Sequence, residues 1–173
     1  MEKINTNTIN ITEHGTNTLH WPDLVPYTES SFGGDWVNDI HDMHTKFGVR
    51  DKVETFEQES MRKFLEFRLN FLREELEETE KAAYEGDEVD CEEVVDGLID
   101  LCVVAIGTLH AFGVDAHLAW NEVHKANMSK EVGIKEGRPN PLGLPDLCKP
   151  KGWQAPNHNG NHGDLPRLNN NGL

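Results

Sequence analysis

Hydrophobic and polar residues follow a helical period through the middle of the chain. No proline interrupts this stretch between Pro26 and Pro139. Within it, apolar residues recur at helical spacing in four segments, which predicts helices at about 35–47, 60–85, 88–112 and 116–129. A glycine follows each of the first three, and Asp115 is a suitable N-cap for the fourth. Because the last three are joined by short loops, we expect antiparallel neighbours in an all-α, four-helix bundle.

Both ends of the chain lack this pattern. Residues 1–30 are rich in Thr and Asn, which predicts a short β arm or a loose extension. Residues 131–173 hold six of the eight prolines, together with many Gly and Asn residues. We expect 157–173 to be flexible, because its few apolar side chains cannot offset the entropy of ordering. The sequence therefore predicts a polar N-terminal extension (1–30), an all-α domain (31–130) and an irregular C-terminal extension (131–173).

The charge balance narrows the possible partners. Acidic residues number 31 against 16 basic ones, giving a formal charge of −15. Such a chain is a poor match for nucleic acid polymers or anionic membranes, which attract clustered Lys and Arg. We see no apolar run near the roughly 18 residues of a membrane span, and no signal-peptide stretch at the start. The three cysteines lack metal-site spacing, so we expect a cytoplasmic protein with reduced thiols.

The acidic residues concentrate in the second predicted helix and the start of the third. Sixteen of the 31 lie between Glu54 and Asp96, and such charge runs usually form a solvated face. A helical wheel, however, places the pair Glu75 and Glu78 on or beside the apolar side of the second helix. It places Glu77 on the opposite side, with Glu74 at the border.

The third helix repeats this arrangement. Glu93, Asp96 and Asp100 line one stripe, and Asp100 lies within the apolar segment GLIDLCVVAIG. A buried aspartate needs a partner, and Arg68 or Arg73 could supply one. Two helices that each offer a carboxylate pair instead favour a metal site, because the carboxylates repel one another and a divalent cation relieves that repulsion. Oxygen ligands select Mg²⁺ or Mn²⁺ over zinc, and carboxylate-bound Mg²⁺ typically completes its shell with water and substrate phosphates.

These motifs resemble a known superfamily. EELEE followed by EEVVDGLID is similar to the E-x-x-E and E-x-x-D signature of the all-α nucleoside triphosphate pyrophosphohydrolases. That superfamily includes the MazG-like enzymes, the dimeric dUTPases and phosphoribosyl-ATP pyrophosphohydrolase. HTKFGV, DGLIDLCVVAIGT, EVHKANMSK and KPKGWQAPN further resemble its phage and bacterial branch. The resemblance covers roughly residues 35–156 and implies a MazG-like bundle.

The resemblance implies Mg²⁺-dependent hydrolysis of a (d)NTP between the α and β phosphates, giving (d)NMP and pyrophosphate. Glu75 and Glu78 match the first ligand pair. For the second pair, Glu93 with Asp96 matches the signature literally, whereas alignment of the following apolar run gives Asp96 with Asp100. We prefer the latter, with Glu93 as a flanking group. A carboxylate must also orient or deprotonate the attacking water, and Glu74 or Glu75 is nearest in sequence.

Asn127 and Lys130 match positions near the nucleotide in similar proteins, and Lys125 lies within one helical turn of Asn127. His44 and Phe47 lie where similar enzymes form a base-binding pocket. The lysines could equally be exposed residues at a helix end, where the macrodipole favours cations. His44, like His41, could instead be a surface or helix-packing residue. Trp153 could cover the pocket or pack on a partner subunit.

The resemblance also implies a homodimer or homotetramer. The apolar second half of the 88–112 helix independently needs more cover than one short bundle offers. Two other functions remain open at this stage. One is hydrolysis of phosphoribosyl-ATP, and the other is a non-catalytic helical protein that uses the same surface for dimerisation or regulation.

Overall fold

The structure is a computed structural model that describes residues 34–135, 137, 142 and 146–169. Its elements are α1 (Trp36–Lys46), α2 (Val49–Glu54), α3 (Gln58–Tyr84), α4 (Cys91–Ala111), α5 (Ala116–Met128), β1 (Glu131–Gly133), β2 (Asp146–Cys148) and the 3₁₀ helix η2 (Leu165–Leu168). The all-α prediction is confirmed, and α1, α3, α4 and α5 correspond to the four predicted helices. The short helix α2 was not predicted. The expected β arm or loose extension at 1–30 lies outside the described residues.

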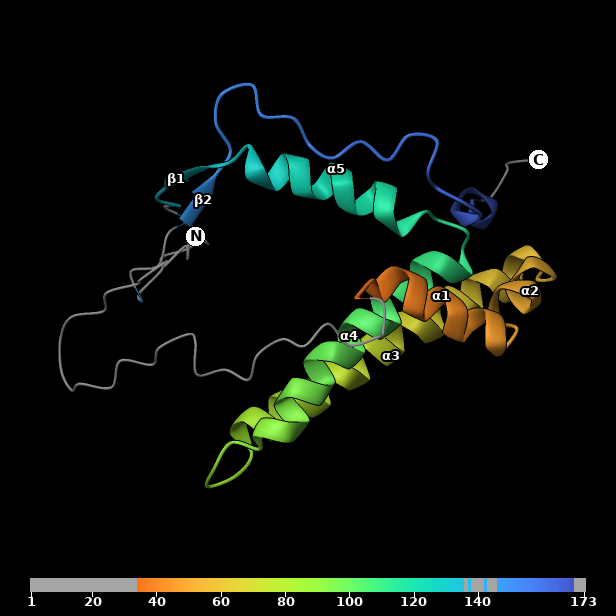
Figure 1. The fold of residues 1–173 in the computed structure, drawn as a ribbon, viewed down its shortest axis with the longest axis horizontal. Coiled ribbons are helices and arrows are strands. Elements are labelled where there is room, and N and C mark those ends of the chain that lie inside the picture. The colour runs from red at the N-terminus through yellow and green to blue at the C-terminus, as the bar shows by residue number, and fades with distance from the viewer. Residues whose placement is uncertain (1–33, 136, 138–141, 143–145, 170–173) are drawn as a thin grey trace, which may run out of the picture. The chain divides into compact units, whose positions relative to one another are not determined.

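The long helices α3 and α4 lie side by side and run in opposite directions (Figure 1). Gly97 of α4 faces Thr79 of α3 at close range. A Cβ atom at position 97 would collide with the Thr79 hydroxyl oxygen, so no larger residue fits without movement. This contact fixes how the two acid-bearing helices face each other.

The buried core lies at one end of this helix pair. Val53, Met61, Ala111, Phe112 and Val114 form it, and residues of α3 and η2 pack around them. Elsewhere α3 and α4 leave large apolar side chains exposed: Phe67, Leu69, Leu76, Val95, Leu98 and Ile99. A single protomer therefore covers only part of its own hydrophobic surface.

Within the described ranges, α4 is the one helix whose length and composition would suffice for a membrane span, with 22% of its apolar window buried. The expectation of no such run was wrong, because α4 passes this test despite containing Asp96 and Asp100. Core helices meet the same criterion, so the finding reflects the apolar character of α4.

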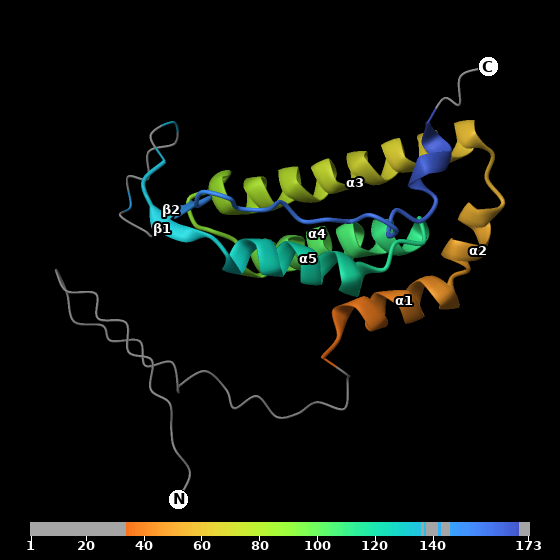
Figure 2. The same ribbon diagram turned by 90° about the horizontal axis from the view of Figure 1, so that it is seen from above.

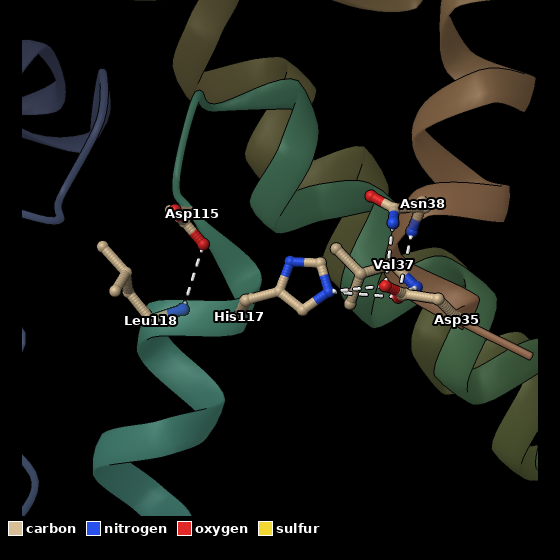
Figure 3. A network of polar contacts seen from close by, with 6 residues as sticks. All are labelled: Asp35, Val37, Asn38, Asp115, His117 and Leu118. Carbon is tan, nitrogen blue, oxygen red and sulfur yellow. Dashed lines mark hydrogen bonds and ion pairs between the residues drawn. The ribbon is translucent and has the colours of Figure 1, made fainter.

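Two capping aspartates connect the start of α1 with the start of α5 (Figure 3). The carboxylate of Asp35 accepts the backbone N–H of Val37 at 3.1 Å, and that of Asp115 accepts the N–H of Leu118 at 3.0 Å. His117 of α5 then places Nε2 3.0 Å from both carboxylate oxygens of Asp35. Each cap satisfies an otherwise unpaired helix N–H, and the histidine joins the two helix starts.

The C-terminal region packs on the helices, and its expected flexibility is wrong for residues 157–169. β1 and β2 pair antiparallel, with Val132 opposite Leu147. Residues 149–164, here called the strap, then run beside α5 towards η2 (Figure 2). Leu165 and Leu168 pack against the core, and Arg50 bridges to Asp164 at 2.7 Å. Contacts with the core and with Arg50 thus help to order a segment that composition alone marks as polar.

Candidate metal and nucleotide site

Glu75 lies among carboxylates contributed by both long helices. Its pKa is raised by partial burial and by the negative charges of Asp100, Glu78, Glu74 and Asp96, in that order. Two of these groups share α3 with Glu75 and two come from α4. The structure therefore brings together the four acids that the sequence grouped across two helices, with Glu74 beside them.

Basic side chains do not neutralise this cluster. Throughout the described residues, no hydrogen bond or ion pair joins an Arg or Lys side chain to Glu75, Glu78, Asp96 or Asp100. Arg68 instead donates to the Thr108 hydroxyl at 3.0 Å and to the Val104 carbonyl at 2.8 Å. Arg73 donates to Asn70 on its own helix. The arginine-paired interpretation of Asp100 therefore has no support in this geometry.

The exposure of the acids agrees only in part with the helical wheel. Glu77 is exposed as expected, whereas Glu75 and Asp100 are half-buried. Glu78 was expected on or beside an apolar face, but it is exposed in the single chain. The wheel describes one helix at a time, and here α4 covers only a narrow part of α3.

The charge of Asp100 raises the pKa of Glu75, whereas Glu93 is not among the groups that do so. Glu93 is exposed, is absent from the charges that raise the pKa of Glu75, and sits in the first turn of α4, where its N–H is capped by Asp90. Position 97, where the aligned signature would place a glutamate, faces Thr79 too closely for any side chain. The geometry thus favours Asp96 with Asp100 as the second pair.

A divalent cation matches this cluster in donor chemistry. Carboxylate oxygens are the ligands that Mg²⁺ and Mn²⁺ prefer, and the mutual repulsion felt by Glu75 is what a cation would relieve. Among the residues that the structure describes, no three Asp, Glu, His or Cys side chains already stand at chelating distances. Side-chain rotation, water and substrate phosphates would have to complete the coordination shell.

His44 is a helix-packing residue in this structure. It is only 4% exposed, and its Nδ1 lies 3.1 Å from Nδ1 of His110 on α4. Burial, His110, Arg68 and His41 together lower the pKa of His44 to about 4. Of the two interpretations that the sequence left open, the packing one describes this contact.

The predicted nucleotide residues at the end of α5 and just beyond it form a separate group. Lys130 donates to the side-chain oxygen of Asn127 at 2.8 Å. Lys125 lines a hollow of about 490 Å³ between α5 and the strap, together with Lys151 and Trp153. In the described part of the chain, no hydrogen bond or ion pair joins these residues to the acids of α3 and α4. Phe47, at the end of α1, is 68% exposed.

Comparison with known families identifies the family to which the chain belongs. The family described as phosphoribosyl-ATP pyrophosphohydrolase matches residues 40–127, just over half of the 173-residue chain. The chain belongs to this family. It is therefore a hydrolase of phosphorus anhydrides within the MazG-like superfamily, as the sequence motifs predicted. No curated protein matches the chain.

Sequence analysis missed several residues that shape this pyrophosphohydrolase. His110 pairs with His44 across 66 residues of sequence, and no local pattern signals such a contact. Thr79 lies within the acidic stretch of α3, yet it is buried against Gly97, and its hydroxyl donates to the Glu75 carbonyl at 2.7 Å. The glycine, placed where the aligned signature would have a glutamate, was the available clue. The matched region ends at 127, so the strap lies outside it.

Proposed function

We propose that this pyrophosphohydrolase cleaves a (d)NTP between its α and β phosphates, giving (d)NMP and pyrophosphate. The observation that carries the proposal is the position of Glu75, whose pKa is raised among carboxylates from both α3 and α4. Such a cluster without basic partners is costly unless a cation binds it. Family membership supports the reaction class, and the carboxylate chemistry supports Mg²⁺, with Mn²⁺ as a substitute.

The carboxylates would hold the metal and activate the attacking water. Glu75, Glu78, Asp96 and Asp100 would hold the metal, with Glu93 flanking them. When bound, the cation neutralises the polyphosphate and lowers the pKa of water for attack on phosphorus. Glu74 or Glu75 would orient the attacking water and accept its proton.

The α5 residues would bind the nucleotide phosphates. A lysine ammonium is a point charge that attracts phosphate, and Lys130 is already ordered by its hydrogen bond to Asn127. Lys125 lies in the last turn of α5, two residues before Asn127, and is exposed. Phe47 remains a candidate contact for the base because its ring is exposed. His44 would need to leave its contact with His110 to reach a ligand.

Phosphoribosyl-ATP is the second candidate substrate, favoured by the family whose description matches the chain. It contains the same phosphorus anhydride, so the proposed chemistry at the carboxylates would be unchanged. Family membership argues against the non-catalytic alternative, as does the acidic cluster, which a purely structural bundle would not need.

We further propose that the protein acts as a homodimer or homotetramer in the cytoplasm, without binding membranes or nucleic acid polymers. The exposed apolar residues of α3 and α4 support self-association, because a second copy would remove them from water. The phage or bacterial origin suggested by the motifs stays part of this proposal.

The direct test is pyrophosphate release from a panel of NTPs, dNTPs, modified nucleotides and phosphoribosyl-ATP, with and without Mg²⁺. Asp100→Asn and Glu78→Gln should each abolish hydrolysis while the fold remains intact by circular dichroism. Glu77→Gln, which alters an exposed acid of α3 outside the proposed ligand set, should retain most activity. Metal-independent release, or equal loss in all three variants, would contradict the proposal.

A further inference from the structure

The long helix pair does not by itself fix the direction of α5. Beyond the turn after α4, α5 leaves the α3–α4 pair, and the strap runs beside it instead (Figure 1). Only Ala116 and Ala126 of α5 are buried, whereas Leu118, Trp120 and Met128 are exposed. Packing against α3 and α4 therefore restrains little more than the first turn of α5.

The strap contacts α5 near its start, its middle and its end. Asn161 donates its side-chain amide to the Asp115 carbonyl and accepts the Asp115 N–H, both at 2.8 Å. The backbone N–H of Asn157 donates to the Glu122 carboxylate at 3.1 Å. The indole N–H of Trp153 donates to the Ala126 carbonyl at 2.8 Å. These contacts lie at successive levels along the helix.

The Trp153 contact occupies a carbonyl that the helix itself leaves free. Carbonyls in the last turn of a helix lack the usual N–H partner four residues later. Here the N–H of Lys130 turns to the Asn127 carbonyl, so the Ala126 oxygen accepts from Ser129 Oγ at 2.9 Å and from Trp153. Lys125 and Asn127, two of the predicted phosphate-binding residues, flank Ala126 directly.

The strap is itself held at both ends. Its first residue follows β2, which pairs with β1 immediately after α5. At its far end, the N–H of Asp164 donates to the Phe112 carbonyl at 2.7 Å, and the Asp164 carboxylate meets Arg50. Gly163 has a φ of +51° and lies directly against Phe112, where a side chain would collide. Because the strap is held at both ends, its contacts with α5 can restrain the position of that helix.

We propose that the strap positions the substrate-binding end of α5, and that Trp153 is the positioning residue. The proposal rests on the proposed function, because Lys125, Asn127 and Lys130 matter only if they bind nucleotide phosphates. It assigns a role to a segment outside the region that matches the family. Trp153 acts here through the backbone of Ala126 and need not touch the nucleotide.

The test compares Trp153→Phe, which removes the indole N–H but keeps an aromatic ring, with Trp36→Phe at an exposed tryptophan on α1. Loss of one hydrogen bond should make the amides at the end of α5 exchange about fivefold faster in Trp153→Phe. KM for the best panel substrate should rise by a similar factor of about five, with kcat unchanged. Trp36→Phe should leave both quantities unchanged.

Glu122→Ala, which removes the middle contact, provides a second variant if Trp153→Phe folds poorly. It should likewise speed exchange in α5 and raise KM without lowering kcat. Faster amide exchange with an unchanged KM would contradict the positioning role. Unchanged exchange in both variants would show that the strap does not restrain α5. A wild-type chain without hydrolysis would contradict the proposed function and its positioning residue, while the exchange data would still decide whether the strap restrains α5.

Discussion

At the scale of single residues, the candidate site is shaped by groups that resist ionisation. Glu75 is half-buried among other carboxylates, and this environment raises its pKa. His44 is buried against His110 and Arg68, and this environment lowers its pKa to about 4. A bound cation would relieve the repulsion around Glu75. The surroundings of His44 instead keep its imidazole neutral down to about pH 4.

His44 should make folding stability depend on pH. Its pKa is about 6.5 when unfolded and about 4 when folded, so the unfolded state takes up the proton first as the pH falls. The contribution of neutral His44 is complete above pH 6.5. It declines between pH 6.5 and 4, lowering the free energy of unfolding by up to about 3 kcal/mol.

Thermal melting across this pH range tests the prediction. His44→Gln should flatten the loss of stability between pH 6.5 and 4, whereas His124→Gln, at an exposed histidine of α5, should not. A pH dependence in His44→Gln as steep as in the wild-type chain would show that another group is responsible.

The sequence predicted which acidic residues group together better than it predicted their exposure or their contacts with other helices. The spacing of Glu75, Glu78, Asp96 and Asp100 was enough to group them, because helical periodicity fixes which residues share a face. It could not show that Glu78 is exposed or that His44 meets His110, since both depend on how helices cross. The metal ligation itself stays a prediction.

At the scale of elements, the close contact between Gly97 and Thr79 sets the spacing of α3 and α4. Gly97→Ala should lower the free energy of unfolding by about 1–3 kcal/mol, because the added methyl overlaps the Thr79 hydroxyl. In the double variant Thr79→Ala/Gly97→Ala, removal of that hydroxyl should recover part of the loss. Urea unfolding of the single and double variants measures this coupling, and strictly additive losses would argue against the contact.

The long helices could be read from the sequence, and the short elements could not. The predicted and observed boundaries of α1, α3, α4 and α5 agree within a few residues, since each has an extended apolar pattern and an aspartate caps the start of α1, α4 and α5. The six-residue helix α2 and η2 are too short to show periodicity. Leu165 and Leu168 order the tail through contacts with the core, which composition cannot reveal.

At the scale of the whole molecule, the exposed apolar face of α3 and α4 predicts self-association. Leu98 on this face is 52% exposed, and nothing in the described part of the protomer buries it. Sedimentation should give a mass at least twice the 19.6 kDa of one chain. Leu98→Glu should shift the protein towards monomer, because it would place a charge in an apolar interface.

Val132→Glu provides the matched control, since Val132 is 76% exposed on β1, away from the α3–α4 face. It should leave the mass unchanged. A wild-type chain that sediments as a monomer would contradict self-association, as would equal effects of the two substitutions.

The central claim is that the acids of α3 and α4 together bind a divalent cation. Calorimetric titration with Mn²⁺ and Mg²⁺ tests it most directly, using the wild-type chain, Asp100→Asn and Glu77→Gln. The account predicts saturable binding that Asp100→Asn weakens by about tenfold or more and that Glu77→Gln leaves nearly unchanged. Absence of binding at millimolar metal, or equal weakening in both variants, would contradict it.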